Sequence, residues 1–157
     1  GETTPYLLIN SDISIEAGKG LWWDLIAARS TEGLVLGHRI DIDDNKTREI
    51  YSGGFDWFMV GPNFDHLFSG RRHFAICYPW LDYCLPLTYI LKQITPTICT
   101  NELCTHKKHD AQWNEESYGF FGKMLSKELG VAYYSKGQFT KICLDTINQG
   151  SHKWSIS

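Results

Sequence analysis

The residues best suited to chemistry lie in three clusters of polar side chains, of which the first is Asn10-Ser11-Asp12, directly after an apolar run. A carboxylate at the carboxyl end of a strand in an α/β sheet faces the crevice where ligands bind. Hard ions such as Mg²⁺ and Mn²⁺ need few protein oxygens when a diphosphate supplies the others. Asp12 with a neighbouring amide is therefore a candidate metal ligand. The alternative is that Asp12 caps the following turn.

The second cluster combines carboxylates with aromatic residues. Asp56 follows a Gly-Gly break and lies next to Trp57, and Asp82 follows Trp80 by two positions. Asp82 would act as a general base that deprotonates an acceptor hydroxyl. Asp56 could bind sugar hydroxyls while a tryptophan stacks on a sugar ring. Since an aspartate at a helix N-terminus is also a good cap, a purely structural role for Asp82 stays open.

The third cluster is the segment 105–113, in which two imidazoles stand three positions apart. His106 and His109, with Asp110 beside the second, can meet on one helical face or in a loop, and either can ligate a metal. Lys107 or Lys108 could neutralise a leaving phosphate. No Cys or Glu completes a zincin-like pattern, so a stand-alone zinc site is not predicted. The alternative is a solvated polar loop before the last helix.

Apolar spacing indicates the elements that must position these clusters. Residues 6–10 form a continuous apolar run, typical of a strand in the centre of a sheet with both faces covered. Alternation and glycine breaks predict strands over 34–42 and 55–60, and a brief strand over 74–77. Helical spacing and caps predict helices over 18–29, 81–94 and 114–129, whereas residues 139–147 fit either a helix or a strand.

These elements predict a single domain over residues 1–157 with an α/β fold, or an α+β fold, in which a mixed sheet is flanked by helices. Hydrophobic residues make up 43% and charged residues 21% of the 157-residue chain, as is usual for a globular protein. The net charge is −3 and there is no basic stripe, so duplex nucleic acid is not an expected partner. The longest apolar stretch, 81–94, carries charged residues and is read as a buried helix rather than a transmembrane segment.

The cysteine pattern gives an expectation about location. The five cysteines are an odd number at irregular spacing, which favours buried thiols in a reducing compartment over a disulfide framework or a zinc site. We therefore expect a cytoplasmic protein. The cysteines are at positions 77, 84, 99, 104 and 143.

Taken in order, the three clusters resemble the GT-A glycosyltransferases, particularly small bacterial and viral members of that family. The resemblance covers roughly residues 6–121. The matching segments are Asn-Ser-Asp-Ile at 10–13 with the D-x-D motif, 30–39 with a strand carrying an Arg, 54–58 with a G-x-D-x-F segment, 74–83 with F-x-I-G…W-D-N, and 106–113 with the late H-x-x-H-D…W stretch.

The resemblance implies roles for the candidate residues. Asp12, with Asn10 nearby, would hold a Mn²⁺ or Mg²⁺ ion that bridges the diphosphate of a UDP- or GDP-sugar donor. His106 or His109 would add a metal or phosphate contact. Asp56 and Asp82 would lie on the side of the carbohydrate acceptor, with Asp82 as the base if the reaction inverts.

The sequence also departs from the family pattern, which leaves other hypotheses open. The D-x-D motif is reduced to Asn-Ser-Asp, and the nucleotide-binding part expected before residue 6 is missing, so we expect another chain or a missing segment to complete the sheet. The alternative function is a catalytically inactive, glycosyltransferase-like subunit of a larger assembly. A small hydrolase or nuclease using Asp12, His106 and His109 is less favoured, since no second carboxylate has a spacing that suits two-metal chemistry.

Overall fold

The computed structural model describes residues 4–62, 64–68, 79–109 and 114–157. It confirms the predicted α/β fold. The strands are β1 (Tyr6–Ile9), β2 (Ile13–Ile15), β3 (Leu34–Gly37), β4 (Arg39–Ile42), β5 (Arg48–Tyr51), β6 (Trp57–Val60), β7 (Thr97–Cys99), β8 (Cys104–Lys107) and β9 (His152–Trp154). The helices are α1 (Gly20–Ser30), α2 (Phe64–Phe68), α3 (Leu81–Leu91), α4 (Glu115–Leu129) and α5 (Lys136–Gly150).

Within the described residues the strands form two mixed sheets rather than the one that the sequence predicts. The larger sheet has the order β1-β6-β3-β7-β9 and the smaller one the order β2-β8-β4-β5. The strand expected over residues 34–42 is divided at His38, so that β3 belongs to the larger sheet and β4 to the smaller. The short link between β3 and β4 thus joins the two sheets. At this link a β-carbon on Gly37 would overlap the indole of Trp57, so only glycine allows the close approach.

The predicted first strand exists, but its expected central position is wrong. Among the described residues, β1 pairs only with β6 and lies at the edge of the larger sheet. Leu8 packs on one face of this sheet, and Leu7 and Ile9 pack on the other. A continuous apolar run shows that both faces are covered, but it does not show whether both edges are paired, because edge pairing involves only backbone groups.

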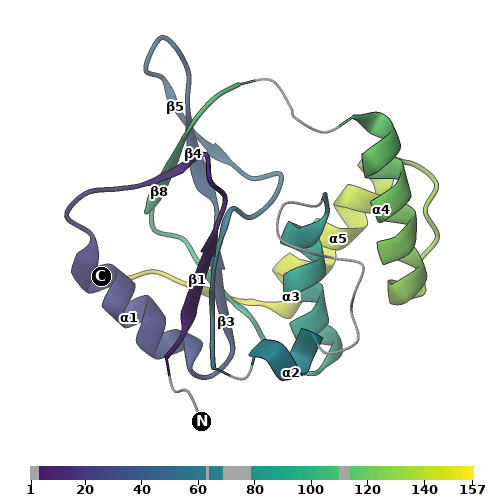
Figure 1. Ribbon diagram of the computed structural model, residues 1–157, viewed down its shortest axis with the longest axis horizontal. Helices are drawn as coiled ribbons and strands as arrows, with labels where there is room; N and C mark the ends of the chain where they lie inside the picture. Colours follow the sequence, from purple (N-terminus) through teal and green to yellow (C-terminus); the bar gives the residue numbers. More distant parts are fainter. Residues whose placement is uncertain (1–3, 63, 69–78, 110–113) are drawn as a thin grey trace.

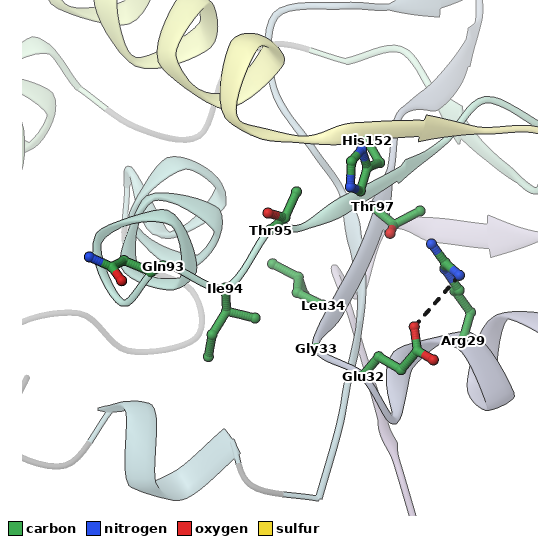
Figure 2. Close-up of a pocket in the computed structure, with 9 residues that line it drawn as sticks. All are labelled: Arg29, Glu32, Gly33, Leu34, Gln93, Ile94, Thr95, Thr97 and His152. Carbon is green, nitrogen blue, oxygen red and sulfur yellow. Dashed lines mark ion pairs between the residues drawn. The ribbon is translucent and has the colours of Figure 1, made fainter.

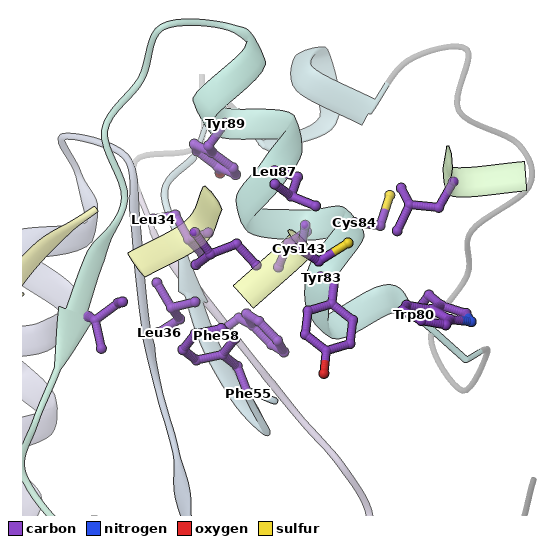
Figure 3. Packing of buried hydrophobic residues seen from close by; sticks show 14 of the residues in the cluster. Leu34, Leu36, Phe55, Phe58, Trp80, Tyr83, Cys84, Leu87, Tyr89 and Cys143 are labelled. Carbon is purple, nitrogen blue, oxygen red and sulfur yellow. The ribbon is translucent and has the colours of Figure 1, made fainter. Parts of the chain in front are cut away.

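Helices cover both faces of the larger sheet (Figure 1), with α1 on one side and α3, α4 and α5 on the other. Alternate residues of β3 contribute to the two cores: Leu34 and Leu36 face α3 and α5, and Val35 faces α1. Figure 3 shows the first core, in which Leu34 and Leu36 lie among aromatic side chains beside α3. This arrangement explains why β3 and β6 are buried along their whole length.

Local signals predict the helices well. Asn114 accepts a hydrogen bond from the backbone N–H of Ser117 at the start of α4, and Gly130 ends this helix in the left-handed conformation. The ambiguous segment 139–147 belongs to α5, whose buried residues Phe139, Cys143 and Ile147 recur at intervals of four. The strand expected over 74–77 lies outside the described residues.

No helix in the described part of the chain is both long and apolar enough to cross a membrane. The thiols of Cys99, Cys104 and Cys143 are buried, and Cys84 is buried as well. Cys77 lies outside the described residues.

Candidate functional site

Strand β8 brings the candidate residues together in the smaller sheet. It pairs antiparallel with β2 and parallel with β4, and His106 is the residue of β8 that lies opposite both Ile13 and Asp41. Asp12 immediately precedes Ile13, so it lies just before the start of β2, and its carboxylate contacts His106. Side chains in register on neighbouring strands project from the same face of a sheet and can touch.

Asp12, His106 and His109 form a compact group with metal-ligating atoms within 4.8 Å of one another. Oδ2 of Asp12 lies 3.4 Å from Nε2 of His106 and 3.2 Å from Nε2 of His109. The side chain of His106 is only 5% exposed, whereas those of Asp12 and His109 are 39% and 42% exposed. The group therefore has one buried member and two members that solvent can reach.

No family model matches this chain, and no curated protein or solved structure shows significant similarity to it. The interpretation of the site therefore depends on its own geometry and chemistry.

The donor set of this group limits the metals that it could hold. Two imidazole nitrogens and one carboxylate oxygen suit first-row divalent ions such as Mn²⁺, Fe²⁺, Co²⁺ and Zn²⁺, whereas Mg²⁺ prefers oxygen ligands alone. Three protein ligands leave coordination positions open for a substrate or water. The arrangement can thus hold a metal that also contacts a ligand from solution.

A chain of polar contacts extends from His106 into the protein. Nδ1 of His106 lies 2.9 Å from Oδ1 of Asp41, and Nε of Arg39 donates to the same oxygen at 2.6 Å. Nη1 of Arg39 donates to Oδ1 of Asp56 at 2.7 Å, and the amide of Asn10 donates to that oxygen at 3.2 Å. The group around His106 and the buried Asp56 are therefore connected through one guanidinium.

The two carboxylates in this chain of contacts, Asp41 and Asp56, have pKa values that are shifted in opposite directions. Burial opposes ionisation of Asp41, but hydrogen bonds from Arg39 and His106 outweigh it and lower the pKa of Asp41. At Asp56 burial is the larger effect and raises the pKa, although Arg39 and Asn10 favour the charged form. Oδ2 of Asp56 is buried and has no hydrogen-bond partner among the described residues. Asp56 therefore lies beneath the surface rather than in an open cleft.

Asp82 occupies the first turn of α3, as expected, in surroundings that disfavour its charge. Burial raises the pKa of Asp82 to about 7, and the negative charge of Asp56 acts in the same direction. Backbone N–H groups, including those of Phe55 and Tyr83, donate to the carboxylate and oppose this rise. The hydroxyl of Tyr83 donates to the carbonyl of Gly53, which holds the segment before β6 against the start of α3.

Two residues predicted to contact the nucleotide lie apart from the Asp12–His106–His109 group. The side chain of Lys107 is 84% exposed and lies on the face of β8 opposite to His106, with Asp44 3.9 Å away. Asn10 contacts Asp56 rather than the metal-ligating atoms. Asp110 and Trp113, which belong to the same sequence cluster as Lys107, lie outside the described residues.

Sequence reasoning missed Asp41 and gave Arg39 no role beyond its place in the resemblance. The two residues lie two positions apart on β4, so they project from the same face of the sheet. An Arg-x-Asp pair in a predicted strand is the signal that could have indicated them. Their partners, His106 and Asp56, come from distant parts of the chain, and the sequence does not show this pairing.

A separate cavity of about 360 Å³ lies at the edge of the larger sheet where the parallel strands β3, β7 and β9 begin (Figure 2). It is bordered by the end of α1, the end of α3 and the starts of β3, β7 and β9. Arg29, which lines it, forms an ion pair with Glu32 at 3.6 Å. None of the candidate catalytic or metal-ligating residues lines this cavity. Ligand sites in α/β sheets lie at the carboxyl ends of the parallel strands, so this position does not favour it as an active site.

Proposed function

We propose that this chain is the metal-binding and acceptor-side part of a GT-A-like glycosyltransferase, which transfers a sugar from a UDP- or GDP-sugar to an acceptor hydroxyl. The observation that carries the proposal is the meeting of Asp12 with His109, 97 positions later, and with the buried His106. The resemblance between motifs, which contains no distances, implies a metal held by Asp12, with His106 or His109 as an added metal or phosphate contact. Asp12 lies directly before β2 of the smaller sheet, and His106 lies on the neighbouring strand β8.

The metal in this proposal is Mn²⁺ rather than Mg²⁺. The two imidazoles favour an ion that accepts nitrogen ligands, and the donor diphosphate would complete its coordination with oxygen. When bound, the ion would act as a Lewis acid that stabilises the charge of the leaving diphosphate. Asp12 and His109 are accessible enough to meet an ion that arrives with its nucleotide.

Asp82 is the proposed general base for the acceptor hydroxyl. A base is most effective when its pKa lies near the working pH, and burial raises the pKa of Asp82 to about 7. Asp56 fits a supporting role better than direct contact with sugar, because its side chain is 5% exposed and paired with Arg39. Burial is the main cause of the high pKa of Asp82 and the charge of Asp56 adds to it, so the two carboxylates act together in this proposal.

Calorimetric titration tests the proposal. The parent chain should bind UDP or GDP only when Mn²⁺ is present, and Asp12→Ala should lose this binding. Asp24→Ala, which removes an exposed carboxylate from α1, is the matched control and should bind as the parent does. Absence of any Mn²⁺ binding by the parent would overturn the proposal. If the parent binds Mn²⁺ but binds neither UDP nor GDP in its presence, a donor site in this chain is excluded.

A second candidate function is a catalytically inactive, glycosyltransferase-like subunit of a larger assembly. Within the described residues, β1 has no partner on its outer edge, and α1 exposes Leu21 and Leu25. Unpaired strands and exposed apolar side chains favour association with other chains. Nucleotide binding followed by sugar transfer in an acceptor screen would exclude this candidate. A stable complex that shows no turnover would support it.

A further inference from the structure

The sheet register places Asp41 directly beside His106. Strands β4 and β8 run parallel, and Asp41 and His106 are paired residues in their register although 65 positions separate them in the chain. Both side chains are largely buried, and Oδ1 of Asp41 lies 2.9 Å from Nδ1 of His106. This contact is built into the backbone pairing of the sheet rather than made by mobile surface side chains.

The contact determines which nitrogen of His106 faces the other ligands. A carboxylate can only accept hydrogen bonds, and of the two carboxylates that face the ring only Asp41 is within good hydrogen-bond distance, at 2.9 Å. The proton of the neutral ring therefore belongs on Nδ1. Nε2, which lies 3.4 Å from Oδ2 of Asp12, then carries the free lone pair that a metal needs. If the proton were on Nε2 instead, His106 could not ligate a metal in this orientation.

Arg39 in turn holds Asp41. Its Nε donates to the carboxylate oxygen that contacts His106, and its guanidinium lies 4.1 Å from the ring centre of Tyr51. The same guanidinium contacts Asp56, so it is fixed from three sides. Because Arg39 is fixed and donates to Asp41, the Asp41 carboxylate has little freedom to turn away from the imidazole of His106.

We propose that Asp41, held by Arg39, is a positioning residue for the metal centre: it fixes the tautomer and ring orientation of His106 so that Nε2 faces Asp12 and His109. The proposal rests on the metal centre of the proposed function but not on the identity of the nucleotide or acceptor. His109 and Asp12 are exposed and adaptable, so His106 supplies the fixed point of the site. Outer carboxylates of this kind typically change metal affinity about 10- to 100-fold.

The decisive experiment compares Asp41→Asn with Asp44→Asn. Both changes remove one negative charge from the same stretch of chain, but Asp44 is exposed and does not contact His106. Titration with Mn²⁺ alone should show an affinity loss of about 10- to 100-fold for Asp41→Asn and little change for Asp44→Asn. Equal affinities in the two variants, with the parent binding Mn²⁺, would overturn this proposal and leave the proposed function intact.

A second measurement uses the parent protein and does not depend on the folding of a variant. Nitrogen-15 NMR of the metal-free chain should show His106 protonated on Nδ1 when its ring is neutral, and Asp41→Ala, which removes the acceptor, should shift the proton toward Nε2. A parent ring protonated on Nε2 would overturn the proposal. A parent that binds no Mn²⁺ would overturn it together with the proposed function. A parent that binds Mn²⁺ but no nucleotide would overturn only the proposed function and would leave the role of Asp41 intact.

Discussion

Gly54 lies so close to the carboxyl group of Asp82 that a β-carbon at position 54 would overlap Oδ2. The chain just before β6 therefore forms one wall around the proposed base at the start of α3. The absence of a side chain at position 54 allows the backbone N–H of Phe55 to approach and donate to Asp82.

Gly54→Ala should destabilise the protein by about 1–3 kcal/mol, because the added methyl group must displace the carboxyl group of Asp82, which backbone N–H groups hold in place. Gly119→Ala is the control, since a β-carbon there meets no atom within 4 Å and alanine favours the helix. Urea denaturation should show a lower free energy of unfolding for Gly54→Ala and an unchanged or higher one for Gly119→Ala. Equal stability of Gly54→Ala and the parent would contradict the close approach.

Asp82 should make the stability of the protein depend on pH in a defined window. Its pKa is about 7 in the folded protein, whereas an unfolded chain should show the ordinary value of 3.8, so the folded protein holds the proton more tightly. The stabilisation from protonated Asp82 is fully present below the unfolded pKa and is lost as the pH rises through the folded pKa. Stability should thus fall between about pH 4 and about pH 7, by a few kcal/mol.

Asp82→Asn should remove this part of the pH dependence. The parent should lose stability relative to Asp82→Asn as the pH rises from about 4 to about 8, and urea denaturation at several pH values would measure the difference. Asp145→Asn, on the exposed face of α5, serves as a control with no comparable change. Parallel curves for the parent and Asp82→Asn would show that Asp82 is not buried in the way described.

The Asp12–His106–His109 group should discriminate between metals. We expect binding of Mn²⁺, Co²⁺ or Zn²⁺ to be tighter than that of Mg²⁺, because nitrogen ligands suit the first three ions better. His109→Ala should weaken Mn²⁺ binding at least about tenfold, or by about 1.4 kcal/mol. His152→Ala, which changes an exposed imidazole at the separate cavity, should leave it unchanged. Similar affinities for Mg²⁺ and Mn²⁺ would indicate that the imidazoles do not ligate the ion.

Lys107→Ala should have little effect on metal or nucleotide binding. Its side chain is highly exposed and points away from His106, so the expected change is within about 0.5 kcal/mol. Titration of Lys107→Ala beside His109→Ala would measure the contrast. A large loss of nucleotide affinity in Lys107→Ala alone would show that this lysine reaches the phosphate, as the sequence pattern predicts.

The helices α1, α3 and α4 could be predicted from the sequence because the signals for them are local, whereas most strands could not. The segment that carries His106, expected as a loop or a helical face, is strand β8. Asn114 and Gly130 mark the ends of α4 through contacts with residues only a few positions away. Asp12, His106 and His109 were predicted as metal ligands through a resemblance between motifs, and their residue types alone left a turn cap and a polar loop as alternatives. Local patterns therefore identify candidate groups but not their distances.

Only the tertiary structure decided which of these groups meet. The division of residues 34–42 between two sheets and the parallel register of β4 with β8 place Asp41 beside His106. The same register turns Lys107 to the opposite face. The burial of Asp56 and the partial burial of Asp82 likewise arise from packing between segments that are distant in sequence. Strand register, burial and the pKa values that follow from burial are long-range properties, because they depend on backbone pairing and side-chain packing between parts of the chain that carry no mutual signal in sequence.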